Sequence, residues 1–246
     1  MPTAILIENV CRSFKEHFWH QKKIILNNIN LEIKQGEVFG FLGPNGAGKT
    51  TTIKIITGLI RPDSGRVEVF GHPAGSQDAR KDIGFLPESP YFYEHLTGYE
   101  FLKIHALLHN MKNYRNRITE LLETVGLTKA ANSFLRSYSR GMLQRIGIAQ
   151  ALLADQALLV LDEPLTGLDP IGRKEIKDIV LEEKKKGKTI FFSSHILPDA
   201  EAVCDRIGII INGEIKNVGE LNQLLKKNTK TDEISLEDWF IEQTKK

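Results

Sequence analysis

The stretch that decides the fold is Gly43-Pro44-Asn45-Gly46-Ala47-Gly48-Lys49-Thr50, which matches the pattern G-x-x-x-x-G-K-[ST]. Its glycines allow successive backbone N–H groups to point into one concavity, where they can hold phosphate. The apolar run Val38–Leu42 is typical of a buried strand, and Thr50–Thr57 begins a helix whose positive end also favours phosphate. We therefore predict that Lys49 reaches the β- and γ-phosphates of a nucleotide and that the Thr50 hydroxyl binds Mg²⁺. The predicted nucleotide-binding residues of this loop are Gly43, Pro44, Asn45, Gly46, Ala47, Gly48, Lys49, Thr50 and Thr51.

Two neighbouring carboxylates follow a second buried strand, in the run Leu158-Leu159-Val160-Leu161-Asp162-Glu163. A strand that ends in two acids, taken alone, more often just meets solvent. Beside a phosphate-binding loop the functional interpretation is stronger, because ligands of open α/β sheets collect at the carboxyl ends of the strands. Asp162 then suits the coordination shell of Mg²⁺, and Glu163 suits a general base that polarises an attacking water. Together the two motifs predict a nucleoside triphosphatase.

Strand and helix signals alternate on either side of these motifs, as in an α/β protein. The predicted strands are Ala4–Val10, Ile29–Ile33, Arg66–Phe70, Ile190–Ser194 and a hairpin of Ile207–Ile211 with Glu214–Ile215. A helix is predicted to begin at Asp169-Pro170 and to end at Gly187. Residues from about 89 to 150 are mostly helical in pattern, with a capping box at Thr97-Gly98-Tyr99-Glu100 and a later cap at Ser139. We predict an α/β fold with a P-loop nucleoside-triphosphatase core, a mainly parallel sheet, an N-terminal antiparallel β portion and an inserted helical subdomain.

The composition excludes several other classes of protein. The 246 residues carry 33 Lys+Arg and 31 Asp+Glu, so the formal charge of +2 is far from that of a dedicated nucleic-acid binder. The longest stretch free of charged residues is Val38–Gly48, much shorter than the roughly 18 apolar residues of a membrane span. Cys11 and Cys204 have no metal-ligand spacing and are expected to be free thiols. The chain by itself is expected to be cytosolic and soluble.

A segment between the two motifs resembles one protein family. Tyr138-Ser139-Arg140-Gly141-Met142 resembles the L-S-G-G-Q signature of ATP-binding cassette proteins and keeps its serine and its second glycine. Gln144-Arg145, which follows, is also typical of the family. A capped helix start is the alternative interpretation of this segment in isolation, but its position between the two motifs favours the signature. The resemblance covers essentially the whole chain.

The resemblance implies roles for further residues. Leu165–Asp169 is similar to the family's D-loop, and His195 is similar to the switch histidine that contacts the γ-phosphate. Glu88 stands where most members carry the glutamine of the Q-loop, so an acid is expected at the Mg²⁺–water site. The adenine-stacking aromatic of the family falls at Phe14. Phe18 or Trp19 could serve instead, and packing in the core is an equal alternative for all three.

The resemblance also implies an assembly. Two chains arranged head to tail would enclose two ATP molecules. A homodimer is favoured over a heterodimer. Each site would combine Lys49, Thr50, Asp162, Glu163 and His195 of one chain with Ser139 and Gly141 of the other, and the D-loop residue Asp169 is also assigned to nucleotide binding. ATP and Mg²⁺ are the implied cofactors. The chain would lie on the cytoplasmic face of the cell membrane as a peripheral subunit.

A separate transmembrane permease is the implied partner, with export favoured over import. Tyr91, Phe92 and Tyr93 are candidates for its contact surface, with packing inside the helical subdomain as the alternative. The expected domains are a cassette over 1–225, with helices inserted at about 89–150, and an extension over 226–246. Within the extension, Ser235–Ile241 looks like the terminal helix of exporter-type ATPase subunits. The rival function is a non-transport cassette ATPase that acts on nucleic acid or ribosomes; no nucleic acid is expected here.

Overall fold

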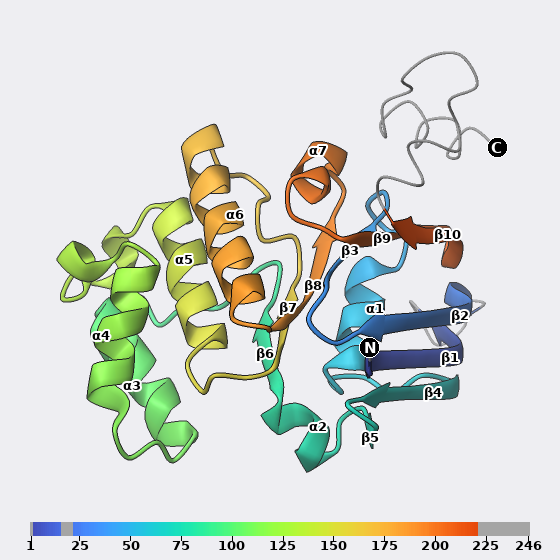
Figure 1. Cartoon of the computed structure of the whole chain (residues 1–246), viewed down its shortest axis with the longest axis horizontal. Helices are drawn as coiled ribbons and strands as arrows, with labels where there is room; N and C mark the ends of the chain where they lie inside the picture. The colour runs from blue at the N-terminus through green and yellow to red at the C-terminus, as the bar shows by residue number, and fades with distance from the viewer. Residues whose placement is uncertain (1, 16–21, 221–246) are drawn as a thin grey trace.

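Two β-sheets and the helices between and around them form the chain (Figure 1). The structure is a computed structural model that describes residues 2–15 and 22–220. Phe18, Trp19, the segment Ser235–Ile241 and the predicted boundary at residue 225 lie outside the described residues. The division into domains therefore stays a prediction.

The first sheet is antiparallel, with the strand order β2-β1-β4-β5. Its strands are β1 (Thr3–Phe14), β2 (Lys23–Lys34), β4 (Ser64–Val69) and β5 (His72–Pro73). In β2, Leu31 and Ile33 are buried while Glu32 between them is exposed, as the period of two predicts. Strands β1 and β2 are longer than the sequence pattern indicated, since polar residues continue the pairing beyond the apolar runs.

The second sheet has six strands in the order β10-β9-β3-β8-β7-β6. These are β3 (Val38–Leu42), β6 (Ile83–Leu86), β7 (Leu158–Leu161), β8 (Thr189–Ser194), β9 (Arg206–Ile211) and β10 (Glu214–Glu220). All neighbours pair in parallel except β9 and β10, which form the predicted hairpin. The predicted fold class is confirmed, with a mainly parallel sheet and an N-terminal antiparallel sheet.

Four of the helices in the described residues begin at a residue whose side chain caps them. The helices are α1 (Lys49–Ile56), α2 (Gln77–Lys81), α3 (Gly98–Leu108), α4 (Tyr114–Thr124), α5 (Arg140–Ala151), α6 (Pro170–Lys185), α7 (Leu197–Glu201) and the 3₁₀ turns η1 (Thr128–Ala130) and η2 (Leu135–Ser137). The four capped helices are α2, α3, α5 and α6. Both halves of the capping box of α3 form, and Ser139 and Asp169 cap α5 and α6. The sequence did not predict β5, β6, α2 and α7, because elements of two to five residues are too short to show a period.

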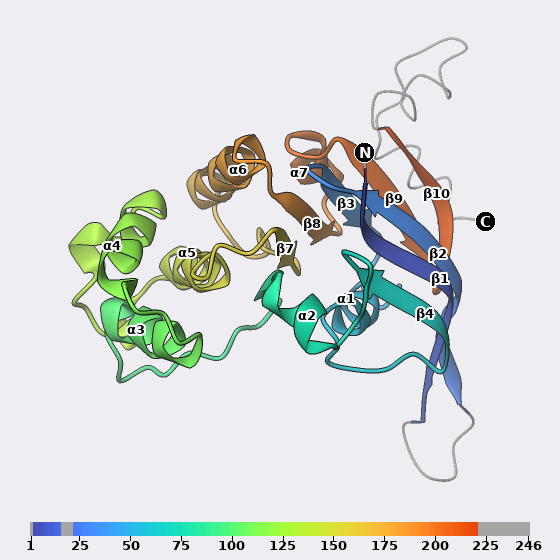
Figure 2. The ribbon, with the colours of Figure 1, turned by 60° about the horizontal axis from the view of Figure 1, so that its bottom comes forward.

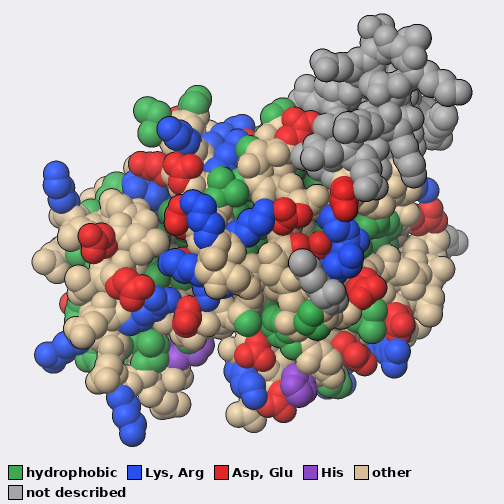
Figure 3. All heavy atoms as spheres, viewed as in Figure 1, with side chains coloured by type: hydrophobic (Ala, Val, Ile, Leu, Met, Phe, Trp, Pro, Cys, Tyr) green, Lys and Arg blue, Asp and Glu red, His purple; other side chains and the backbone are tan. Residues whose placement is uncertain are grey.

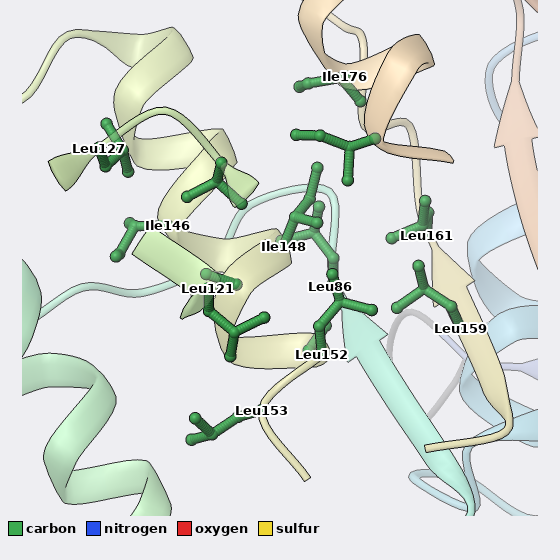
Figure 4. Close-up of a cluster of buried hydrophobic side chains, with 14 of the residues drawn as sticks. Leu86, Leu121, Leu127, Ile146, Ile148, Leu152, Leu153, Leu159, Leu161 and Ile176 are labelled. Atoms are coloured by element: carbon green, nitrogen blue, oxygen red, sulfur yellow. The ribbon is translucent and has the colours of Figure 1, made fainter. Parts of the chain in front are cut away.

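The parallel sheet buries both faces, and successive side chains along its strands contribute to different clusters. Leu158 and Val160 pack with α1 and the antiparallel sheet, whereas Leu159 and Leu161 pack with α5 and α6. Figure 2 shows α1 between the two sheets, and Figure 4 shows the cluster on the other face. That cluster continues from the sheet into α4 through Leu121, so the helices of the middle third are anchored on the sheet.

The described surface carries charges of both signs, and Figure 3 shows them interspersed on one face. None of the helices in the described part of the chain is long and apolar enough to cross a bilayer. Cys11 and Cys204 are both free thiols, as predicted. Burial raises the pKa of Cys204.

Candidate functional site

Three neighbouring strands of the parallel sheet deliver the predicted site residues to one edge. Leu42 at the end of β3 pairs with Ser194 of β8, and Leu161 at the end of β7 pairs with Phe192 of β8. The glycine-rich loop, the acid pair and His195 each follow one of these strand ends. Because parallel strands end at the same edge, three segments far apart in the sequence meet there.

The conformation of the glycine-rich loop requires glycine at particular positions. Gly48 has φ of +113°, and a Cβ built there would lie 2.6 Å from Leu26 Cδ2. A Cβ on Gly43 would lie 2.3 Å from the carbonyl oxygen of Ile210. A larger residue at either position would push the loop off β2 or β9. The loop leads directly into α1, which presents its N-terminal N–H groups to the same side.

A cavity of about 340 Å³ opens over the loop. It is lined by Phe14, Ile25, Asn45, Gly46, Gly48, Lys49, Thr50, Thr51, Glu88 and Glu163. A Cβ on Gly46 would meet no atom within 4 Å, so the backbone is open at that point. The cavity combines backbone N–H groups, a cation and a helix N-terminus, which together suit a phosphate chain.

Lys49 is held at the base of the cavity. Its side chain is buried, and its Nζ donates hydrogen bonds to the carbonyl oxygens of Gly43 at 2.7 Å and Pro44 at 3.2 Å. The same Nζ lies 3.1 Å from Oε1 of Glu163, which is also buried. This ion pair joins the phosphate loop, which follows β3, to the acid pair, which follows β7 on the other side of β8.

Glu163 is constrained in its backbone and in its carboxylate. Its φ is +51°, a left-handed conformation that costs a non-glycine residue roughly 1–2 kcal/mol. Oε2 accepts a hydrogen bond from Thr166 Oγ1 at 2.9 Å and lies 2.8 Å from His195 Nδ1. Among the described residues, none gives Oε1 a hydrogen bond of regular geometry beyond its ion pair with Lys49. That oxygen can therefore still accept a proton from a water molecule.

The pKa of Glu163 stays below its ordinary value even though the group is buried. Burial raises the pKa of Glu163. The charge of Lys49 and the hydrogen bonds from His195 and Thr166 together lower it by more than burial raises it. The carboxylate is therefore ionised at neutral pH, as a general base requires.

The pKa of Asp162 is shifted in the opposite direction to that of Glu163. Burial raises the pKa of its carboxyl above the usual range, and the nearby charges of Glu88 and Glu163 act in the same direction. Hydrogen bonds from Ser193 and Thr50 oppose this rise in pKa. Asp162 Oδ1 accepts the Ser193 bond at 2.7 Å.

The oxygen groups at this edge fit Mg²⁺. Thr50 hydrogen-bonds to Asp162, and Glu88 lines the cavity beside them. A search of the described residues finds no group of three or more His, Cys, Asp or Glu side chains that could hold a metal. Mg²⁺ is usually held by one or two carboxylates together with substrate phosphates. The oxygen groups of Thr50, Asp162 and Glu88 match this type of coordination.

Phe14 at the end of β1 lines the same cavity. The guanidinium of Arg12 lies 4.6 Å from the ring centroid of Phe14, and Arg12 is held by an ion pair with Asp63. The ring is 38% exposed, so it is not a core residue. An aromatic surface beside a phosphate site can stack on a nucleotide base.

We expect Phe14→Ala to weaken ATP binding roughly three- to tenfold, because the variant loses one stacking surface. Titration with a fluorescent ATP analogue measures this loss. Inorganic tripolyphosphate has no base, so its competition for the site serves as the control and should stay unchanged. An equal loss for both ligands would mean that Phe14 shapes the loop and does not stack on adenine.

Eight predicted site residues do not line this cavity; five of them belong to the loop or adjoin Glu163, namely Gly43, Pro44, Ala47, Asp162 and His195, and the other three lie elsewhere. Ser139 is exposed at the start of α5, Gly141 follows it, and Asp169 caps α6 by accepting a hydrogen bond from the Gly172 N–H at 2.8 Å. None of the three lines the cavity of its own chain. The start of α5 instead packs on the loop before α6, where Arg140 covers Gly167 so closely that a Cβ would lie 2.2 Å from its Cζ.

Several contacts of the site were not predicted from the sequence. Ile25 lines the cavity, Thr166 bonds to Glu163, and Ser193 bonds to both acids. Ser193 and Ser194 directly precede His195, but no local pattern indicates which groups their hydroxyls bond. The sequence did not indicate Ile25 as a site residue, because apolar residues occur in every strand.

Comparison with known proteins places the chain among transporter components. A family model described as ABC transporter matches residues 26–166. An ABC transporter ATP-binding protein of Nostoc is 45% identical over 98% of this chain and 73% of its own length. The bacitracin transport ATP-binding protein BcrA of Bacillus licheniformis is 43% identical, over 87% of this chain and 70% of its own length. The linearmycin resistance ATP-binding protein LnrL of Bacillus subtilis is 40% identical, over 84% of this chain and 68% of its own length.

Solved structures agree with the sequence comparison. The ATP-binding subunit of an ABC transporter superposes with a TM-score of 0.83 at 30% identity, covering 97% of this chain and 98% of the other. A dimeric ATP-binding cassette in a post-hydrolysis state, bound to ADP and Pi, superposes with a TM-score of 0.80 at 27% identity. That alignment covers 88% of this chain and 98% of the other.

Proposed function

Because this chain belongs to the ABC transporter family as an ATP-binding subunit and ATPase, we propose that it drives export through a separate transmembrane permease. The observation that carries the site assignment is the convergence of Lys49, Glu163 and His195 beside a cavity over a phosphate loop. Support for export comes from relatives named for bacitracin transport and linearmycin resistance. We propose that the subunit acts at the cytoplasmic face of the cell membrane.

We propose that the cavity binds the triphosphate of ATP. Lys49 and the N–H groups of the loop hold the phosphates, and Phe14 carries the adenine. Thr50, Asp162 and Glu88 would hold Mg²⁺, which neutralises phosphate charge when bound.

Glu163 is the proposed base for hydrolysis. Its ionised carboxylate takes a proton from the attacking water at Oε1, the oxygen that pairs with Lys49 but not with His195 or Thr166. His195, whose Nδ1 bonds to Oε2, keeps the carboxylate oriented, and its other ring nitrogen is the proposed contact for the γ-phosphate. The neighbouring side chains thus orient the carboxylate of Glu163, and this carboxylate accepts the proton.

We propose that two copies enclose two ATP molecules. Ser139, Gly141 and Asp169 lie outside the cavity of their own chain, which is consistent with a role at the site of a second copy. The N-terminus of α5 would then bring N–H groups and its helix dipole to the γ-phosphate from the other side. A dimeric relative bound to ADP and Pi supports this arrangement. Loss of the γ-phosphate would remove the link and open the dimer.

An exposed aromatic pair is our candidate for the permease contact. Tyr91 is 83% exposed and Tyr93 is 49% exposed, and their rings meet edge to face at 5.7 Å. Phe92 between them instead packs on Phe101 at 5.4 Å, inside the cluster around α3. For Phe92 the alternative of internal packing therefore holds, and only the two tyrosines face outward.

The permease proposal is tested by co-expression with a candidate permease subunit, followed by detergent extraction. We expect the two proteins to purify together, and the double variant Tyr91→Ala/Tyr93→Ala to lose most of the partner. Leu59→Ala, at a residue 62% exposed outside the pair, is the matched control, and ATP binding reports folding. A chain that instead purifies with nucleic acid or ribosomes, and without a membrane protein, would favour the non-transport alternative.

A further inference from the structure

Ser193 contacts both acids of the proposed site at once. It lies near the end of β8, its side chain is fully buried, and Leu161 just before the acid pair is in register with Phe192 just before Ser193. The Ser193 hydroxyl donates to Asp162 Oδ1 at 2.7 Å and accepts from the Glu163 backbone N–H at 2.9 Å. A single hydroxyl therefore links the side chain of one acid to the backbone of the next.

The direction of these two bonds follows from their chemistry. A backbone N–H can only donate, so Ser193 Oγ is the acceptor at Glu163 and its proton is left for Asp162. Alanine at this position would leave a buried carboxylate oxygen without its donor and a buried N–H without its acceptor. Asp162 would keep its hydrogen bond from Thr50 but lose the one from Ser193, and the Glu163 peptide would lose the bond to its N–H.

The bond to Glu163 acts on a residue with an unusual backbone. Glu163 has φ of +51°, and its N–H is fixed by Ser193 before the chain turns into the loop. This peptide sets the direction in which the Glu163 side chain leaves the strand. Ser193 fixes the backbone of Glu163 from β8, and His195, which directly follows the last residue of β8, contacts its carboxylate.

We propose that Ser193 is a positioning residue for ATP hydrolysis, which holds Asp162 and Glu163 in a shared geometry through its one hydroxyl. The proposal rests on the proposed function, since it assigns a task to Ser193 in that same site. Ser193 touches no ligand in this scheme; it acts through the two acids. Its loss should therefore affect the rate of hydrolysis much more than the binding of ATP.

The first test replaces Ser193 with alanine, which removes the hydroxyl without adding volume. We expect kcat for ATP hydrolysis to fall about 10- to 100-fold, the usual range for residues that support a metal ligand or a catalytic group. The KM for ATP should change far less. A kcat within about twofold of the parent chain would overturn the proposal.

A matched pair of variants separates the hydroxyl from the packing of the buried site. Ser193→Thr keeps the hydroxyl and Ser193→Val has nearly the same shape without it. We expect kcat to be higher for the threonine variant than for the valine variant by about tenfold. If the two variants lose activity equally, packing explains the loss and the proposal fails.

A binding measurement provides a readout that does not depend on turnover. ATP affinity is titrated for the full chain with Mg²⁺ and with EDTA. In EDTA the alanine variant should bind as the parent chain does, which also reports that it is folded. With Mg²⁺ it should lose part of the gain in affinity that the parent shows, by a smaller factor than kcat falls, because Asp162 has lost one of its hydrogen bonds. An equal loss in both conditions would indicate general unfolding of the site and overturn the proposal.

A different variant, Glu163→Gln, tests the proposed function separately from the role of Ser193. If Glu163→Gln blocks hydrolysis while Ser193→Ala does not, only the role of Ser193 is wrong. If Glu163→Gln hydrolyses ATP normally, the proposed site itself is wrong, whatever Ser193 does.

Discussion

Replacing Glu163 with glutamine is expected to lower ATP hydrolysis about 100- to 10,000-fold while ATP still binds. Glutamine has the same size but cannot accept the proton that leaves the attacking water. The neighbours that hold the side chain, Thr166 and His195, remain in place. Because the γ-phosphate is then kept, the ATP-bound dimer should accumulate.

Release of phosphate measures hydrolysis, and size-exclusion chromatography with ATP measures the dimer. Glu182→Gln is the matched control, since Glu182 is 57% exposed and pairs with the nearby surface residue Lys185. The control should hydrolyse ATP as the parent chain does and remain mostly monomeric after turnover. Normal turnover in Glu163→Gln would remove this residue from the role of base.

Replacing Lys49 with alanine should weaken ATP binding about 10- to 100-fold, since charged hydrogen bonds to phosphate are lost. The variant has a second effect within the fold. Glu163 would lose the cation 3.1 Å away and become a buried carboxylate with less compensation, so its pKa should rise. The loss of activity should therefore exceed the loss explained by binding.

A fluorescent ATP analogue measures the binding, and the thermal midpoint reports any change in folding. Lys185→Ala, at a side chain 71% exposed, is the control for removing one lysine charge. Unchanged affinity in Lys49→Ala would contradict the assignment of the phosphate-binding loop.

Local features of the structure could be predicted from the sequence because they depend on few neighbouring residues. A loop with φ of +113° at Gly48 needs glycine, and the helices after Ser139 and Asp169 need a side-chain acceptor at their first residue. The apolar runs of β3 and β7 identified buried strands, and the residues after them could then be assigned to the ligand edge. Each of these requirements involves residues that are close together in the sequence.

Contacts between distant segments could not be predicted in the same way. Phe14 reaches the cavity, Tyr91 is exposed while Phe92 is partly buried, and Ser193 lies against the acid pair. Each of these depends on which strands become neighbours and on the register between them. That choice is made by the packing of the whole core, since one strand pairing is favoured only when the faces of both sheets are covered together.

The sequence by itself thus determined what kind of chemistry the chain can perform, because phosphate binding needs particular residues at particular spacings. The tertiary structure alone decided how the acid pair is held. Ser193 is thirty residues from Glu163 along the chain and 2.9 Å from it across two strands. Only the order β8-β7 in the sheet brings the hydroxyl to the two acids, and no local pattern records that order.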